Sequence, residues 1–209
     1  MKTYLFLLAA ILFLSAAKAQ QRGTTSLNLY GGYTFKDKVN FDGFYGYVNE
    51  AFQYGGGLEF FVQDSRSVEL KYLRMDTHLP LYGPANTQLN EGTDKGSVNY
   101  ILIGGNKYFG DNKNGKVAPY AGADLGIGIV DVKDGGSTTK FAWDAKIGVK
   151  LRTSSAVSLK IQAYFQNIIG AVGSNMYITG GGAYVSVPDY VSVFQFGLGG
   201  ALTFDFRRK

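Results

Sequence analysis

Apolar and polar residues alternate along several stretches of this chain. Over residues 141–151 one set of alternate positions is apolar, and the other is mostly charged or small. The same period of two recurs over 157–166 and over 194–206, where phenylalanine and leucine alternate with glutamine, glycine and threonine. Successive side chains of a strand point to opposite faces, so each stretch predicts a strand with one apolar face and one polar face.

This alternation and the intervening turn residues predict eight strands. They are expected at residues 24–35, 51–63, 66–75, 96–109, 117–130, 139–152, 156–168 and 190–206. Short connections at 64–65, 110–116 and 153–155 alternate with mostly longer ones at 36–50, 76–95, 131–138 and 169–189. Such alternation is typical of barrels in the bacterial outer membrane. The pattern therefore predicts an all-β, eight-stranded antiparallel up-and-down transmembrane barrel with short periplasmic turns and longer external loops.

The first residues have the pattern of an export signal. Lys2 gives a positive start, residues 5–14 form a short apolar core, and residues 17–19 match an A-x-A cleavage site. We therefore expect residues 1–19 to be a cleaved signal peptide and residues 20–209 to form one outer-membrane barrel domain. No later stretch approaches the roughly 20 apolar residues that a membrane-spanning helix needs.

The predicted strand faces place apolar residues against lipid and charged residues inside the barrel. An eight-stranded barrel is only wide enough for side chains to fill, and buried charges are tolerated chiefly as pairs. Five acids and five bases on the polar phase therefore predict a plugged, salt-bridged lumen. These are Glu59, Glu69, Lys71, Lys107, Asp124, Asp144, Lys146, Lys150, Lys160 and Asp205. Outward aromatic residues near strand ends, such as Tyr108, Trp143 and Phe206, are expected at the membrane interfaces.

Composition narrows the chemistry further. The chain has one histidine and no cysteine, which excludes disulfides and thiolate metal sites and argues against zinc. We expect no metal and no cofactor. Loss of Lys2 and Lys18 with the leader leaves 19 basic residues against 16 acidic ones, a net charge of +3. That excess is too small to predict a nucleic-acid partner.

Two strands carry a resemblance to a known family. Residues 119–122, Pro-Tyr-Ala-Gly, with Gly126 and Gly128 after them, resemble a strand of the small outer-membrane barrels of the OmpA, OmpX and OmpW superfamily. The export signal and the glycine-rich barrel are also similar to porin-like barrels of Bacteroidota. The resemblance covers essentially the whole mature chain, and it implies architecture rather than activity.

The closing strand adds to the resemblance. Gly199, Leu202, Phe204 and Phe206 are similar to the C-terminal signal by which the barrel-insertion machinery recognises its substrates. Residues 207–209 depart from the family pattern, because they place three basic residues after the aromatic on which family members commonly end.

The external loops hold two sets of candidate contact residues. Lysines near the predicted rim could pair with lipopolysaccharide phosphates or form a solvated rim; these are Lys36, Lys38, Lys95, Lys133 and Lys140. Residues of the first and fourth loops could anchor a surface partner or stack on one another; these are Phe41, Phe44, Tyr45, Tyr47, Met176, Tyr177, Tyr184 and Tyr190.

The function favoured by these features is a non-enzymatic outer-membrane protein, with an envelope-structural or surface-interaction role through its external loops. A small-solute pore is the first alternative, against which the balanced interior charge argues. A lipid-modifying enzyme would have to use the single histidine, His78, beside Asp76, and would need an apolar bore. A soluble lipocalin-like carrier would need the opposite assignment of the faces.

Overall fold

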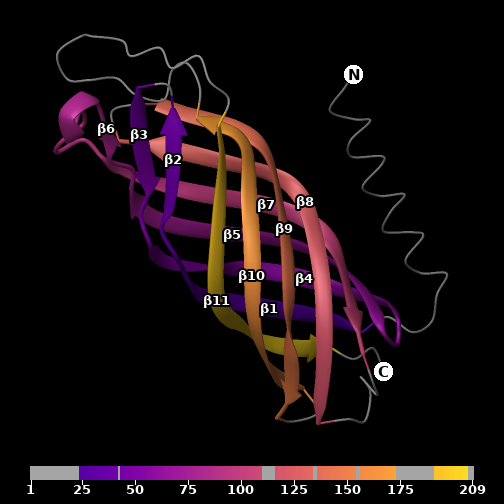
Figure 1. Cartoon of the computed structure of the whole chain (residues 1–209). Helices are drawn as coiled ribbons and strands as arrows, with labels where there is room; N and C mark the ends of the chain where they lie inside the picture. Colours follow the sequence, from indigo (N-terminus) through magenta and orange to yellow (C-terminus); the bar gives the residue numbers. More distant parts are fainter. Residues whose placement is uncertain are drawn as a thin grey trace, which may run out of the picture.

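A computed structural model of the chain describes residues 24–41, 43–109, 116–133, 136–153, 156–172 and 191–206. Eight antiparallel strands form a closed barrel in the order β1-β11-β10-β9-β8-β7-β5-β4, closed by the β1–β4 pair (Figure 1). The barrel strands are β1 (Thr25–Thr34), β4 (Ala51–Gln63), β5 (Arg66–His78), β7 (Lys95–Tyr108), β8 (Val117–Val132), β9 (Gly136–Arg152), β10 (Val157–Val172) and β11 (Val191–Phe206). None of the described residues forms a helix long and apolar enough to cross a membrane.

The barrel confirms the predicted fold class, strand number and antiparallel order. The third long connection is shorter than expected, because the ladder of β8 and β9 continues to the pair Val132 and Gly136. Residues 133–135 alone join these two strands. Strand β10 continues to Val172, into the predicted fourth loop. The predictions for the rest of that loop, for the signal peptide and for residues 207–209 concern residues outside the described ones.

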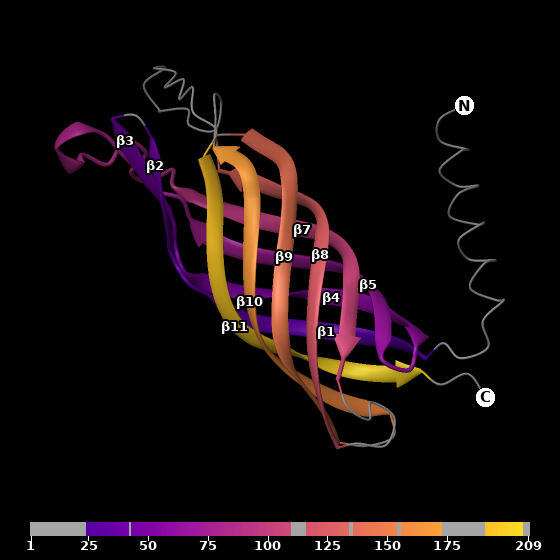
Figure 2. The same cartoon turned by 45° about the vertical axis from the view of Figure 1, so that its right-hand side comes forward.

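Three short strands form a second sheet beyond the barrel end that carries the longer loops (Figure 2). They are β2 (Asp37–Phe41), β3 (Phe44–Val48) and β6 (Leu81–Tyr82), in the order β2-β3-β6. The first two form a hairpin in the first long connection. The third comes from the second connection, where a short 3-10 turn at Pro84–Asn86 follows it.

Glycine allows neighbouring barrel strands to approach closely. A Cβ atom on Gly126 would lie 2.0 Å from the carbonyl oxygen of Ile101, and one on Gly104 would lie 2.1 Å from that of Ala123. Both distances are far below van der Waals contact, so neither position has room for another residue without a backbone shift. Glycine at these two positions thus allows the backbones of β7 and β8 to approach closely.

The outward face of the barrel is apolar and exposed. Ile103, Leu125 and Ile147 each expose more than half of their surface. Aromatic residues face outward toward the long-loop end; they are Tyr33, Phe52, Tyr54, Tyr72, Phe141, Trp143, Phe165, Phe194 and Phe196. At the other end lie Phe60, Phe204 and Phe206. An apolar band between two aromatic girdles is the surface that a transmembrane barrel presents to lipid.

Candidate functional site

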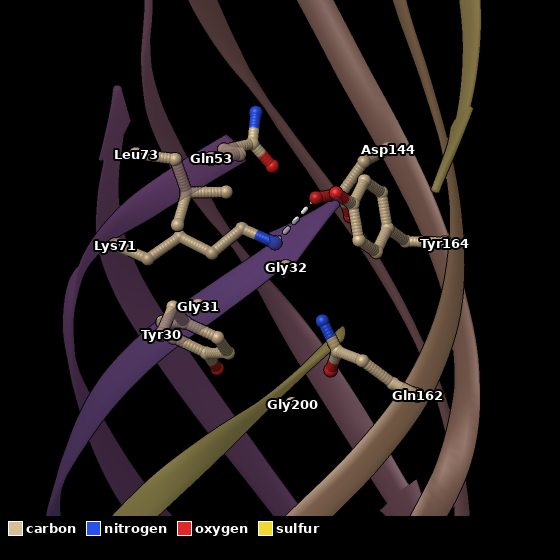
Figure 3. Close-up of a pocket in the computed structure, with 10 residues that line it drawn as sticks. All are labelled: Tyr30, Gly31, Gly32, Gln53, Lys71, Leu73, Asp144, Gln162, Tyr164 and Gly200. Carbon is tan, nitrogen blue, oxygen red and sulfur yellow. Dashed lines mark hydrogen bonds and ion pairs between the residues drawn. The ribbon is translucent and has the colours of Figure 1, made fainter. Parts of the chain in front are cut away.

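The bore is filled by ion pairs from its middle to the short-turn end. The ammonium group of Lys71 lies 2.8 Å from Oδ2 of Asp124 and also pairs with Asp144 across the bore (Figure 3). Lys146 extends the chain of charges, at 2.7 Å from Asp124 and 3.1 Å from Glu69. All five side chains are nearly inaccessible to solvent, so these contacts are buried salt bridges.

A second group of buried polar contacts in the bore surrounds the carboxylate of Glu59. Lys160 approaches its Oε2 at 2.6 Å, while the Tyr108 hydroxyl and the Asn106 amide donate to its Oε1 at 2.7 and 3.0 Å. Asn106 also donates to Glu69, at 3.2 Å, and so links the two carboxylates. Neutral donors therefore share the two acids with the lysines, as buried charges require.

Aromatic rings and one more ion pair fill the short-turn end. The ring of Tyr108 lies between those of Phe61 and Tyr120, with centroids 5.3 and 5.4 Å away. Lys150 lies over the Phe61 ring at 5.3 Å and pairs with Asp205 at 3.2 Å. This end of the bore is thus occupied by packed side chains rather than open to solvent.

The long-loop half of the bore has a different composition. Its inward side chains form one apolar cluster that includes Leu73, Met75, Val98, Tyr100, Leu102, Val130, Ala142, Ile168 and Val193. Val39, Val48, Leu79 and Leu81, from the external sheet and its connection, belong to the same cluster and cover the barrel end. Buried glutamines share this half with the cluster, because Gln53 donates to Gln166 at 3.2 Å and Gln166 donates to Gln195 at 3.4 Å. The expectation of a polar lumen is therefore wrong only for the part of this half that the apolar cluster fills. The external sheet covers this end of the bore with apolar side chains.

Strand β5 shows why the two halves differ, because the polarity of its faces reverses along its length. Toward the short turn its inward residues are Glu69 and Lys71, and its outward residues are Val68 and Leu70. Toward the long loop the inward residues are Leu73 and Met75, and the outward ones are Arg74, Asp76 and His78. The first arrangement suits lipid outside and the second suits water outside, so the boundary of the apolar band lies near Tyr72.

A small cavity of about 10 Å³ remains where the two halves meet (Figure 3). Its polar lining comes from Tyr30, Gln53, Lys71, Asp144, Gln162 and Tyr164. This volume has room for about one water molecule. It does not connect the two ends of the barrel, because ion pairs fill one side, and apolar side chains with hydrogen-bonded glutamines fill the other.

The prediction that Lys107 belongs to the lumen charge network is wrong. Lys107 lies opposite Arg66 and Ala121 on the outward face, is exposed, and donates to the Ser65 hydroxyl at 2.9 Å. Its neighbour Tyr108, expected in an outward girdle, instead points into the bore. Both phases of this strand contain apolar residues, so alternation alone did not distinguish inside from outside. The other nine predicted charges lie on the inward face.

The five rim lysines fall in three places. Lys36 and Lys38 lie on or beside the external sheet, and Lys95 and Lys133 lie at the barrel rim; all four are exposed. Lys140 is opposite Gly128 on the inward phase of β9 and is half-buried. Of the proposed insertion signal, the side chains of Leu202, Phe204 and Phe206 point outward, while Gly199 lies on the inward phase of β11.

The single histidine does not form a catalytic triad among the described residues. Its Nδ1 lies 3.1 Å from Oδ2 of Asp94, not next to Asp76. Asp76 instead accepts hydrogen bonds from Arg74 at 2.6 Å and from Tyr54 at 2.9 Å. In the described part of the chain no hydroxyl group hydrogen-bonds to the imidazole, and no metal-ligating cluster is found.

Sequence reasoning missed an outward polar network beside the rim. Tyr72 and Arg74 donate to the amide oxygen of Asn99, at 2.8 and 3.4 Å, and Asn99 donates to Asp131 at 3.1 Å. The sequence did contain a signal for this network. Positions 68 and 70 of this face are apolar, whereas positions 74, 76 and 78 of the same face are polar.

Comparison with known proteins places this architecture in a family. The model of the outer membrane protein beta-barrel domain matches residues 6–200. Neisserial surface protein A is 16% identical, with a TM-score of 0.60, 89% of this chain covered and 100% of that chain. OprG of Pseudomonas aeruginosa is 12% identical, with a TM-score of 0.61 and coverages of 89% and 97%. The N-terminal barrel of OprF from the same organism is 14% identical, with a TM-score of 0.50 and coverages of 88% and 100%.

At these identities the solved structures support the fold alone. No curated protein sequence matches this one. The family model covers most of the chain, and the closed barrel with its apolar outer band agrees with it. The chain therefore belongs to the outer membrane protein beta-barrel domain family and is an eight-stranded barrel of the bacterial outer membrane.

Proposed function

We propose that this protein is a non-enzymatic component of the outer membrane that acts through its external loops, in envelope structure or in surface interaction. A cleaved signal peptide at residues 1–19 would direct its export, and the barrel-insertion machinery would receive the strand that ends at Phe206. The barrel then serves as a membrane anchor for the external sheet.

The filled bore is the observation that carries this proposal. Buried salt bridges occupy the periplasmic half, and apolar side chains together with hydrogen-bonded glutamines occupy the other half under the external sheet. An ion that crossed would have to break the first and enter the second, which is strongly unfavourable for a charge. The structure thus supports an anchor better than a small-solute pore.

Recording from planar bilayers tests the proposal. Purified protein should give no discrete and reproducible conductance steps, whereas a porin added to the same bilayers should give them. Reproducible steps from this protein would favour the small-solute pore. A His78→Ala variant tests the enzymatic alternative, because loss of a measured lipid turnover in that variant would contradict a non-enzymatic role.

Outer-membrane lipid is the second proposed partner. Lys95 and Lys133 are exposed at the external rim, and the backbone N–H of Lys133 donates to the carbonyl oxygen of Lys95 at 2.8 Å. Two ammonium groups on adjoining residues suit the phosphates of lipopolysaccharide, since lysine is a common phosphate partner. Their replacement by alanine should reduce the lipopolysaccharide that copurifies with the barrel. Unchanged retention would remove this contact from the proposal.

A further inference from the structure

Three tyrosine rings from two different loops meet on the external sheet. Tyr45 of β3 is the direct partner of Tyr82 of β6, and their rings stack with centroids 5.0 Å apart. The Tyr47 ring meets both of them edge-on, at 5.8 and 6.0 Å. These are favourable geometries for aromatic pairs, so the three rings form one fixed surface.

Two lysine side chains lie over this surface. The ammonium group of Lys36 is 4.7 Å from the centroid of the Tyr47 ring, and that of Lys38 is 4.5 Å from the centroid of the Tyr45 ring. Cation–π attraction holds both groups in place, which lowers the entropy lost when they bind an anion. We call these five residues, Lys36, Lys38, Tyr45, Tyr47 and Tyr82, the Tyr–Lys face.

The opposite side of the sheet fixes the Tyr–Lys face to the barrel. Val39, Val48 and Leu81 alternate with its residues and are buried in the apolar core. The carboxylate of Asp37, on that buried side, accepts a hydrogen bond from the backbone N–H of Phe194 at 2.8 Å. The Tyr–Lys face therefore points away from the barrel, on a sheet that projects beyond the barrel end (Figure 2).

The polar groups of the face have little to bind within the chain. Lys36 and Lys38 are exposed, and in the described ranges no carboxylate forms an ion pair with either of them. The Tyr45 hydroxyl donates to the Asn86 side chain at 2.9 Å, whereas the hydroxyls of Tyr47 and Tyr82 have no hydrogen-bond partner within the described segments. Within the part of the chain that the structure describes, two cations and two hydroxyl groups are thus available to a ligand.

We propose that the Tyr–Lys face binds an acidic polysaccharide. The positive groups favour a ligand with negative charge, and the hydroxyls of Tyr47 and Tyr82 suit the many hydroxyl groups of a sugar chain. Lys36 and Lys38 are two residues apart along an extended segment, which separates them by roughly 7 Å. That spacing fits a chain with repeated charges that lies across the open sheet better than it fits one small anion.

Other acidic partners fit the face less well. Protein partners usually insert aromatic anchors into pockets, but these rings pack on one another and under the ammonium groups. The lipopolysaccharide phosphates lie at the membrane surface, near the aromatic girdle, whereas the sheet projects past it. The inference rests on the proposed surface-interaction role and deepens it by naming the class of partner.

Binding of dextran sulfate to the full chain tests the inference. The protein is placed in detergent micelles free of lipopolysaccharide, with neutral dextran as the uncharged comparison. We expect dextran sulfate to bind with an affinity that falls as salt is raised, and neutral dextran not to bind. The double variant Lys36→Ala and Lys38→Ala should lower the affinity about tenfold or more, because it removes two charged contacts.

A matched double variant, Lys107→Ala and Lys116→Ala, removes two exposed lysines from the periplasmic end and should change the affinity less than twofold. Tyr47→Leu removes the ring under Lys36 but keeps both charges, and should still weaken binding several-fold. Both Lys36 and Lys38 are exposed, so the variants should keep the wild-type circular dichroism spectrum.

Several results would overturn the inference. One is equal binding of dextran sulfate and neutral dextran. Another is an equal loss of affinity for dextran sulfate in the two double variants. A third is binding of polyglutamate or of lipopolysaccharide vesicles as tight as that of dextran sulfate. None of these results would affect the bilayer recordings. Conductance steps would refute the proposed function itself.

Discussion

The ion pair between Lys160 and Glu59 offers the sharpest test of how the bore is held together. The two groups are 2.6 Å apart, with 1% and 0% of their side chains exposed. Replacement of Lys160 by methionine keeps much of the side-chain volume but leaves the Glu59 carboxylate buried without its nearest cation. The other buried lysines are already engaged, since Lys150 pairs with Asp205 and Lys146 with Glu69 and Asp124.

The expected effect follows from the geometry. At an effective dielectric constant of about 20, unit charges at the 2.6 Å separation attract by roughly 6 kcal/mol. Desolvation of the two ions offsets much of this, so the pair itself contributes little net stability. Removal of one partner is different, because it leaves an uncompensated charge; we expect Lys160→Met to lower the free energy of unfolding by about 3–5 kcal/mol. Adding Glu59→Gln should restore more than half of that loss.

The assay is equilibrium unfolding by urea in lipid vesicles. Trp143 is the only tryptophan, and its ring packs 5.8 Å from that of Phe165 on the outer face, so its fluorescence reports on the folded barrel. The exposed pair Arg74 and Asp76 is the control, and Arg74→Gln should cost about 0–1 kcal/mol. A loss below about 1 kcal/mol for Lys160→Met, or no recovery in the double variant, would refute the reasoning.

Three further predictions follow from other parts of the barrel. In the same urea assay, Gly126→Ala should destabilise the barrel by at least about 2 kcal/mol or block its folding, because the new Cβ would meet the Ile101 carbonyl. Gly56→Ala is the control and should be nearly neutral, because its Cβ would have its nearest contact at 3.6 Å. Lys107→Met should change the free energy of unfolding by less than about 0.5 kcal/mol, and Lys146→Met should lower it by several kcal/mol, because only Lys146 is buried. Equal losses in these two variants would contradict the outward placement of Lys107. Partial burial raises the pKa of Asp37 above 3.8, although hydrogen bonds from backbone N–H groups oppose the shift. The folded state therefore holds this proton more tightly than the unfolded state, and stability should fall relative to an Asp37→Asn variant as pH rises through the raised pKa; a difference independent of pH would contradict this.

The sequence was sufficient for the barrel because lipid and bore impose opposite demands on alternate residues. That contrast is strong in β9 and β10, where Lys146, Lys150 and Lys160 alternate with exposed apolar residues. It is weak in β7, where both phases are partly apolar, and there Lys107 and Tyr108 were assigned to the wrong faces. The alternation of residues shows which side of a strand faces the bore only where the lipid-facing and bore-facing residues differ in polarity.

The external sheet could not be predicted for another reason. Tyr82 meets Tyr45 only because the second long connection returns to pair with the hairpin of the first. Each loop by itself shows tyrosine and glycine without a clear period. The apolar upper bore depends on the same sheet, since inward residues such as Leu73 and Met75 are buried by a cover that local alternation does not reveal.

Accessibility of single cysteines to a membrane-impermeant thiol reagent tests the central claim most directly. The chain has no cysteine, so a variant at each chosen position gives an unambiguous signal. In intact lipid vesicles, cysteines at the inward positions Leu73, Leu102 and Thr203 should stay unlabelled, while a cysteine at exposed His78 is labelled quickly. Labelling of the inward positions at the His78 rate would show water in the bore and contradict a closed barrel.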